Sequence, residues 1–115
     1  MVAGSDGYIP DRGHLVWVLL DPTRGREQSG RRPVVILSPR SYNGRVGLAV
    51  GCPVTRSVKG YPFEVALPVD CVAQGVVLAD QVKSFDWRVR DVEFAALFDD
   101  GPLRAVSRRA ATLIG

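Results

Sequence analysis

The hydrophobic and polar positions of the chain fall into short segments separated by turn residues. Residues 13–20 (GHLVWVLL) are almost wholly apolar, which is typical of a strand buried on both faces. Residues 61–67 (YPFEVAL) alternate instead, which predicts a half-buried strand, and Pro62 favours the edge of a sheet. Runs of these two kinds predict strands over residues 13–20, 32–38, 46–54, 61–67, 75–83 and 92–97.

The segments between these strands have the residue types of turns and loops. Residues 21–30 (DPTRGREQSG) contain almost no apolar side chain, so they predict a long exposed loop. Asn43-Gly44 predicts a turn, and residues 55–60 predict a polar connection.

Near the C-terminus the apolar residues recur at spacings of three and four, as they do on one face of a helix. These residues are Leu103, Val106, Ala110 and Leu113. Asp100 can cap such a helix, and Pro102 suits its first turn. Short strands followed by one helix predict a mainly β fold, in which a compact antiparallel, barrel-like sheet packs against a C-terminal helix.

A length of 115 residues fits one domain. Residues 1–7 are small and polar and do not resemble a signal peptide, so we expect a flexible N-terminal segment followed by one domain over residues 8–115. The longest apolar run, residues 15–20, is too short to span a bilayer. A cytoplasmic protein without membrane contact is expected.

The sequence contains no zinc signature, phosphate-cradling Walker loop or dinucleotide fingerprint, so no metal or cofactor is expected. Cys52 and Cys71 match neither a metal spacing nor a disulfide framework, and we expect both to be small buried hydrophobic residues. The single histidine, His14, opens the first predicted strand, where a structural role is favoured over a catalytic one. A mechanism that needs two histidines is excluded.

Carboxylates offer a weaker indication of a site. Asp80, Asp86 and Asp91 lie close together in the sequence, as paired acidic catalysts can, but their spacing specifies no site.

The net charge is only +3, but it is unevenly distributed. Residues 24–59 hold eight basic residues and one acidic residue, a net charge of eight minus one, or +7. Such a block is typical of a surface that binds a polyanion. A solvated basic face is the alternative, and charge alone does not separate the two.

Arginine and threonine are the residue types left to carry chemistry on a phosphate. The planar guanidinium of arginine binds two phosphoryl oxygens and stays charged, and a threonine hydroxyl can add a hydrogen bond. Arg32 stands where the predicted loop meets a strand, and Thr55 stands at the end of the third strand. The alternatives are a surface arginine paired with Glu27 and a hydroxyl that caps a turn. Spacing alone does not establish that the two strand ends meet.

Several motifs together carry a resemblance to a known family. The longest is residues 27–39 (EQSGRRPVVILSP), and the others are residues 13–17 (GHLVW), 53–55 (PVT), 59–65 (KGYPFEV) and 79–84 (ADQVKS). In combination they resemble the MazF/PemK family of toxin endoribonucleases over about residues 8–115.

The resemblance implies an SH3-like barrel of the CcdB/MazF (Kid/PemK) toxin type, a homodimer, and a cognate MazE-like antitoxin whose acidic tail occupies the RNA groove. It also implies cleavage of single-stranded mRNA at a short motif without a metal or cofactor, which leaves a 2′,3′-cyclic phosphate and a 5′-hydroxyl and arrests translation and growth. The likeness of residues 59–65 to ACA-cutting members suggests an ACA-containing motif.

Position by position, Arg32 matches the family's catalytic arginine, Thr55 its catalytic threonine and Glu27 a loop glutamate implicated in activity. Resemblance and charge together assign RNA-binding positions to Arg24, Arg26, Gln28, Arg31, Arg56, Lys59, Asp80, Gln81 and Lys83. One branch of the family pairs an arginine with an aspartate in the fifth strand. Here Leu78 replaces that arginine, which argues against a mechanism centred on Asp80.

Two other functions are compatible with this fold. One is a non-enzymatic DNA gyrase poison of the CcdB type, which would act through the C-terminal helix. That helix carries Arg104, Arg108 and Arg109 and lacks a terminal aromatic residue, which argues against this function. The other is a catalytically silent module that binds RNA or an antitoxin.

Overall fold

The computed structural model describes residues 7–19 and 30–114. The predicted loop at 21–30 therefore lies almost wholly outside the described residues, together with most of the predicted N-terminal segment. The elements in chain order are β1 (His14–Leu19), β2 (Arg31–Ile36), α1 (Arg40–Val46), β3 (Leu48–Thr55), β4 (Glu64–Ala66), β5 (Val76–Leu78), the short 3-10 helix η4 (Ala79–Gln81), β6 (Lys83–Asp86), β7 (Glu93–Leu97) and α2 (Asp100–Ile114).

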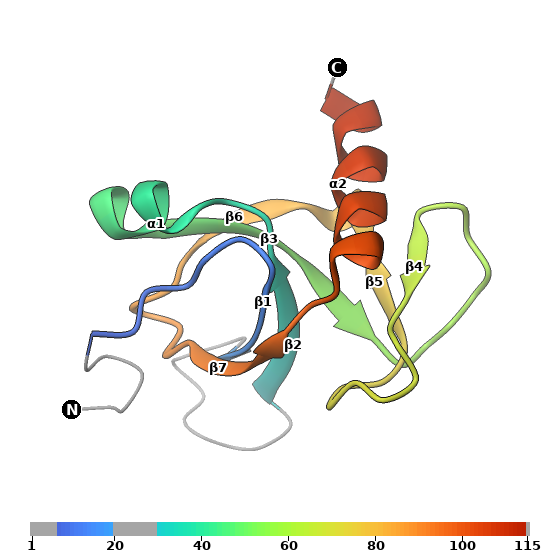
Figure 1. The fold of residues 1–115 in the computed structure, drawn as a ribbon, viewed down its shortest axis with the longest axis horizontal. Coiled ribbons are helices and arrows are strands. Elements are labelled where there is room, and N and C mark those ends of the chain that lie inside the picture. The colour runs from blue at the N-terminus through green and yellow to red at the C-terminus, as the bar shows by residue number, and fades with distance from the viewer. Residues whose placement is uncertain (1–6, 20–29, 115) are drawn as a thin grey trace.

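The strands form one strongly bent antiparallel sheet in the order β4-β5-β3-β2-β1-β7 (Figure 1). β3 is its longest strand. Along one edge it pairs with β2, and along the other it pairs with β6 near its start and β5 at its end. The sheet is barrel-like but does not close, because β4 and β7 lie at opposite ends of the order. The predicted mainly β fold with a C-terminal helix is confirmed, and so is the edge position of β4.

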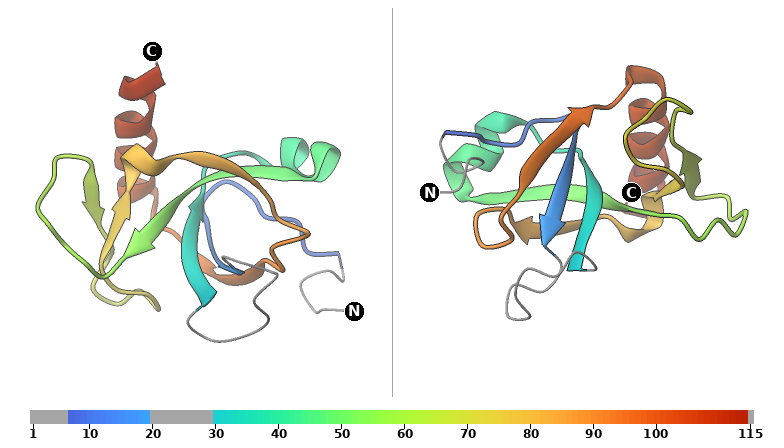
Figure 2. Two further views of the ribbon diagram at one scale, coloured as in Figure 1. Left: turned by 180° about the vertical axis from the view of Figure 1, so that it is seen from behind. Right: turned by 90° about the horizontal axis from the view of Figure 1, so that it is seen from below.

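Both faces of the sheet are covered, as the apolar character of the first two strands predicts. Along β1, Leu15 belongs to one buried cluster and Val16 to the other. The first cluster includes Val106 of α2, which packs beside β4 and η4, whereas the second includes Trp87. The two helices lie far apart, with α1 at the start of β3 and α2 at the β4–β5 end (Figures 1 and 2).

The turn predicted at Asn43-Gly44 is wrong, because both residues lie inside α1. Asn43 is fully buried rather than exposed. Its Nδ2 donates to the carbonyl oxygens of Pro10 (2.7 Å) and Ser38 (3.0 Å), and its Oδ1 accepts from the Ser38 hydroxyl (2.6 Å). The backbone reverses instead at Gly47, which ends α1 with a left-handed φ of 79°.

Three further details differ from the prediction. The strand predicted at residues 75–83 is interrupted by η4 and becomes β5 and β6, which pair with different parts of β3. The strand predicted at residues 61–67 is shortened to β4, and Tyr61 is exposed rather than on its buried face. α2 begins at Asp100 itself, whose carboxylate pairs with Arg104 at 2.9 Å, so Asp100 is the first residue of the helix and not its cap.

Candidate functional site

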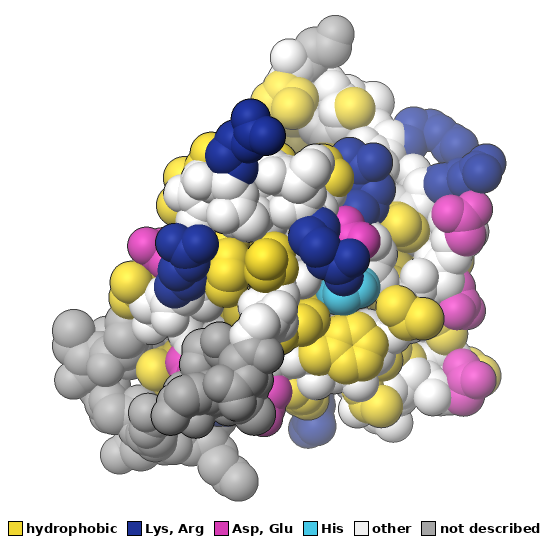
Figure 3. Space-filling view, turned by 60° about the vertical axis from the view of Figure 1, so that its left-hand side comes forward, with side chains coloured by type: hydrophobic (Ala, Val, Ile, Leu, Met, Phe, Trp, Pro, Cys, Tyr) yellow, Lys and Arg dark blue, Asp and Glu magenta, His cyan; other side chains and the backbone are white. Residues whose placement is uncertain are grey.

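The single histidine, His14, lies in an aromatic cluster with Tyr8 and Phe94. Nδ1 of His14 accepts from the Tyr8 hydroxyl (2.8 Å) and from the backbone N–H of Asp11 (3.3 Å), and its ring packs edge-on against Phe94. Burial lowers the pKa of His14, and the Arg40 charge adds to this effect while Asp11 opposes it. Figure 3 shows the face that carries α1, where basic side chains are spread among apolar and uncharged ones around the histidine. The expected structural role of His14 agrees with these contacts.

The ends of β2 and β3 bring Arg32 and Thr55 together. Val34 pairs with Pro53, and Arg32 and Thr55 each lie two residues beyond that pair, on the same face of the sheet and in the lining of one pocket. Pairing between the two strands ends at Val34, because β2 continues alongside β1 while the end of β3 continues alongside β5. Pro53 also has no N–H to donate to a ladder. The strands therefore diverge at this point and leave a space between their ends.

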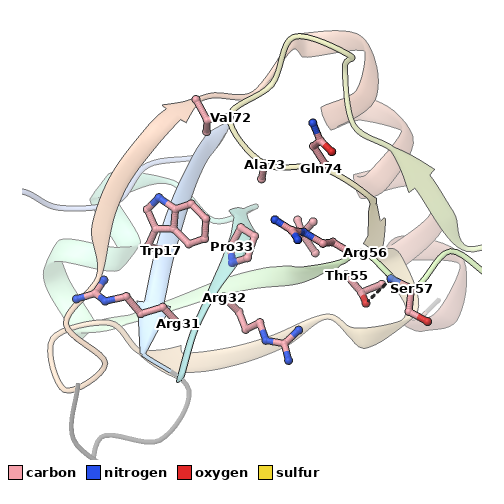
Figure 4. Close-up of a pocket in the computed structure, with 11 residues that line it drawn as sticks. Trp17, Arg31, Arg32, Pro33, Thr55, Arg56, Ser57, Val72, Ala73 and Gln74 are labelled. Atoms are coloured by element: carbon pink, nitrogen blue, oxygen red, sulfur yellow. Dashed lines mark hydrogen bonds between the residues drawn. The ribbon is translucent and has the colours of Figure 1, made fainter. Parts of the chain in front are cut away.

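A pocket of about 790 Å³ occupies this space (Figure 4). Its volume lies within the range of about 300–1,000 Å³ that is common for ligand sites. The lining comes from β1, β2, the end of β3 with the residues after it, and the loop before β5. The lining residues are Trp17, Arg31, Arg32, Pro33, Val54, Thr55, Arg56, Ser57, Val72, Ala73 and Gln74.

The Thr55 hydroxyl is oriented by the chain that follows it. Its Oγ1 accepts from the backbone N–H of Ser57 at 3.1 Å, as in a turn capped by a side-chain hydroxyl. That bond uses a lone pair of the oxygen and leaves the hydroxyl proton available to a group in the pocket. The turn-capping and phosphate-binding functions that the sequence offers for Thr55 are therefore compatible.

The arginines of the pocket differ in their partners. Arg31 pairs with Asp91 (3.2 Å) and Glu93 (3.3 Å), so its charge is largely engaged in joining β2 to the start of β7. Arg32 and Arg56 are exposed, and neither has an ion-pair partner among residues 7–19 and 30–114. In Figure 4 the Arg32 guanidinium extends towards the Thr55 side, whereas Arg31 points away from it. Arg32 and Arg56 are thus the available cations of the pocket.

The remaining predicted RNA-binding residues fall into two groups. Lys59, Asp80, Gln81 and Lys83 do not line the pocket. Lys59 lies in the loop after β3, Asp80 and Gln81 lie in η4, and Lys83 pairs with Gly51 in the sheet. Arg24, Arg26, Glu27 and Gln28 lie outside the described residues, so their roles stay predictions.

Two of the three clustered aspartates have structural partners. Asp86 Oδ1 accepts from the backbone N–H groups of Arg88 (3.0 Å) and Val89 (3.1 Å), which caps a turn, and Asp91 pairs with Arg31. Within the described part of the chain, no three His, Cys, Asp or Glu side chains gather as metal ligands would. No helix in that part is long and apolar enough to cross a membrane.

Sequence reasoning missed the apolar half of the pocket. Trp17 and Pro33 are a cross-strand pair of β1 and β2, and Val72, Ala73 and Gln74 belong to the loop before β5. Trp17 pairs with Pro33, the residue after Arg32. A predicted pairing of the first two strands could therefore have placed Trp17 near the site. The 72–74 loop carries no comparable signal, because only the fold brings it to the ends of β2 and β3.

A barrel-like antiparallel sheet, one C-terminal helix and a pocket lined by arginines and hydroxyls at two strand ends define a small β protein with a candidate site for an anion. A family described as PemK-like, MazF-like toxin of type II toxin-antitoxin system matches residues 11–114. The chain belongs to this family. The resemblance found in the sequence motifs is confirmed, and with it the fold type.

Individual relatives support the same assignment. The chain is 45% identical to the endoribonuclease toxin MazF of Escherichia coli strain K12 over 108 residues, which cover 94% of this chain and 96% of the relative. It is 50% identical to MazF from Deinococcus radiodurans, whose crystal structure superposes with a TM-score of 0.85 over 94% of this chain and 98% of that one. A MazE–MazF complex from the same organism superposes with a TM-score of 0.84 at 46% identity, over 94% of this chain and 97% of that one.

Proposed function

We propose that this chain is the toxin of a type II toxin-antitoxin system and an endoribonuclease that cleaves single-stranded RNA without a metal ion. The observation that carries the proposal is the convergence of Arg32 and Thr55 in one pocket, where two strand ends diverge. The relatives named as endoribonucleases, MazF among them, support the same activity. The site residues named by resemblance are part of this proposal.

The pocket provides two of the elements that such a reaction needs. The 2′-oxygen of the nucleotide attacks the adjacent phosphorus, the bond to the 5′-oxygen breaks, and negative charge builds on the phosphoryl oxygens. Arg32 would stabilise that charge with its paired N–H donors, and the Thr55 hydroxyl would donate to the same oxygens. The products are a 2′,3′-cyclic phosphate and a 5′-hydroxyl.

Two proton transfers complete the reaction. The 2′-hydroxyl gives up its proton, and the departing 5′-oxygen gains one. We assign the first transfer to Glu27, which resemblance places among the catalytic residues, because a carboxylate is a common general base. Arg32 would transfer a guanidinium proton to the 5′-oxygen as the phosphorus–oxygen bond breaks, and the neutral guanidine would regain a proton from water.

The biological setting follows from the relatives. The Deinococcus radiodurans structures hold MazF with MazE, and we propose a cognate MazE-like antitoxin for this chain. We further propose a homodimer, cytoplasmic action on mRNA, and cleavage at an ACA-containing motif. Sequencing the 5′ ends of cleaved RNA tests the motif, and sedimentation of the purified chain tests the dimer.

Substitution of the two pocket residues tests the central proposal. Single-stranded RNA is incubated with the chain in EDTA, and initial cleavage rates are measured. Arg32→Ala is expected to lower kcat by about 100- to 1,000-fold, because it removes a charged donor from the developing anion. Thr55→Ala is expected to lower it by roughly 10- to 100-fold, since it removes one hydrogen bond to a charged group.

Matched controls separate site chemistry from loss of charge or of a hydroxyl. Arg45→Ala removes an exposed arginine from the last turn of α1, and Thr112→Ala removes an exposed hydroxyl from α2. Both variants should cleave like the parent. Absence of cleavage by the parent, or a requirement for magnesium, contradicts the proposal. RNA binding without cleavage would instead indicate the catalytically silent module.

A further inference from the structure

The pocket has two compartments, because its residues come from opposite faces of the sheet. Arg32 and Thr55 share a face with Val34 and Pro53, since side chains two positions apart in a strand lie on the same face. Trp17, Pro33 and Val54 belong to the other face. The divergence of β2 from β3 joins the two sides, so one pocket has a side with Arg32 and Thr55 and a side with Trp17, Pro33 and Val54, where Arg31 also lies.

The two tryptophans of the chain differ in a way that bears on ligand binding. Trp87 is buried, its indole N–H donates to the Asn43 carbonyl oxygen at 3.0 Å, and Arg88 covers its ring at 4.9 Å from the centroid. Trp17 is only partly buried, and within residues 7–19 and 30–114 its indole has no hydrogen-bond partner and no cation or second ring against it. Trp17 lines the pocket, so part of its side chain is accessible there.

Arg56 and the 72–74 loop stand across the pocket from this ring. In the view of Figure 4 the Arg56 side chain points towards Trp17, with Pro33 drawn between them and Ala73 above. Gln74 lies at the rim and is exposed. An amide presents both a donor and an acceptor, which is what the edge of a nucleobase requires. We call Trp17, Pro33, Arg56, Ala73 and Gln74 the slot.

We propose that the slot binds one unstacked nucleobase of the RNA, with its flat face against the Trp17 indole and its edge at Gln74, beside the phosphate held by Arg32 and Thr55. Single-stranded RNA is commonly recognised by splayed bases that stack on aromatic rings and on the planes of arginine guanidinium groups. The shared pocket favours RNA over an apolar peptide. A nucleobase is covalently joined to a phosphate, so a base in the slot would place that negative charge beside the neighbouring arginines. This inference rests on the proposed function and adds a base-binding residue to it.

Abasic substitution tests the slot. The probe is an oligonucleotide spanning a mapped cut site, made resistant to cleavage by a 2′-deoxy sugar at the cut nucleotide, and its binding is measured by fluorescence anisotropy. Single bases near the cut are removed one at a time. For the parent, removal of one particular base is expected to weaken binding by roughly 5- to 150-fold, the loss typical of one stacked base.

Trp17→Ala should bind the intact oligonucleotide roughly 5- to 150-fold more weakly than the parent does. Removal of the same base should then weaken binding by this variant only slightly further. Trp17→Phe, which keeps a ring, should restore most of the affinity. Trp87→Phe is the matched control and should show the position-dependent losses of the parent. Gln74→Ala, a change in an exposed loop, should broaden the base preference at that position in cut-site maps.

The outcomes separate the slot from the proposed function. A parent that does not cleave RNA refutes the proposed function. If the parent cleaves RNA but Trp17→Ala binds it equally well, or loses affinity equally at every abasic position, the slot is refuted alone. If Trp17→Ala binds RNA normally but loses a synthetic acidic peptide that competes with RNA for the parent, the slot is a peptide site and the proposal is wrong.

Discussion

At the scale of single residues, Arg31 and Arg32 show how adjacent side chains of one type acquire different functions. Both belong to the basic segment that the sequence predicts to bind a polyanion. Strand alternation sends them to opposite faces, where Arg31 meets Asp91 and Glu93 while Arg32 faces the pocket with Thr55. The sequence motif contains both arginines. Because Arg31 is engaged in ion pairs, Arg32 is the one of the two that is available to a substrate.

Cys52 is predicted to be unreactive in the folded protein. It is fully buried, and burial together with the nearby Asp80 charge raises the pKa of its thiol to about 12. Thiolate is the reactive form, so Cys52 stays protonated at neutral pH. Ellman's reagent should label only the partly exposed Cys71 in folded protein and both thiols in denaturant. Rapid labelling of folded Cys71→Ser would show that this burial is wrong.

The His14 cluster makes a prediction about pH and stability. Burial lowers the pKa of His14 below its ordinary value of 6.5, so the unfolded chain takes up a proton first as pH falls. The contribution of neutral His14 to the free energy of unfolding is therefore fully present above pH 6.5. It is lost as the pH falls through the lower pKa of His14 in the folded state. Protonation would also remove the Nδ1 acceptor used by Tyr8 and Asp11.

The measurement is the urea midpoint between about pH 7.5 and pH 5, which brackets the ordinary histidine pKa. It should fall with pH in the parent and stay nearly level in His14→Gln. Burial alone would raise the pKa of Asp11, but N–H donation from Arg40 and Arg12 and nearby charges hold it below the ordinary value of 3.8, so Asp11 changes stability only near and below that pH. An equal slope in parent and variant would mean that His14 is not the group responsible.

At the scale of elements, most of the fold was predictable and the exceptions have physical causes. β1, β2, β3 and α2 follow from their apolar residues, because each buries several of them. β7 was also predicted, although none of its residues is fully buried. α1 was not predictable from Asn43-Gly44, since a dipeptide typical of turns is overridden by the hydrogen bonds that bury Asn43. The strand predicted over residues 75–83 was too long, because only Val76–Leu78 pair as β5 before η4 interrupts the strand. β6 begins at Lys83, has the polar sequence KSFD and pairs with another part of β3.

The junction of β3 and β5 depends on Gly75. Its φ is +118°, and a Cβ at this position would overlap the carbonyl oxygen of Thr55, which is backbone and cannot move aside. Gly75→Ala should therefore destabilise the fold by about 1–3 kcal/mol, the cost of a strained backbone conformation. It should also lower the cleavage rate, because Thr55 would shift. The measurements are the free energy of unfolding in urea and the initial rate.

Gly101→Ala is the matched control. Gly101 lies in the first turn of α2, where an added Cβ would have no neighbouring atom within 4 Å, and alanine favours helix by about 1 kcal/mol. This variant should be at least as stable as the parent and equally active. Equal stability of Gly75→Ala and the parent would mean that β5 does not approach Thr55 as closely as described.

At the scale of the whole molecule, the sequence predicted the charged half of the candidate site and not its apolar half. Arg32 and Thr55 could be predicted from the sequence, because each lies in a recognisable motif at the end of a predicted strand. Trp17 reads as an ordinary core residue of an apolar strand, and residues 72–74 have no motif at all. Their relation to Arg32 arises only when a bent sheet brings β1, the ends of β2 and β3 and the 72–74 loop around one space.

The central claim is that this pocket cleaves RNA by using the 2′-hydroxyl of the substrate. The most direct test compares two oligonucleotides in EDTA, one entirely RNA and one with a single 2′-deoxy sugar at the mapped cut nucleotide. We expect cleavage of the first with a 5′-hydroxyl on the downstream product, and no cleavage of the second. Cleavage of the deoxy-substituted oligonucleotide at the same bond, or a 5′-phosphate on the downstream product, would contradict it.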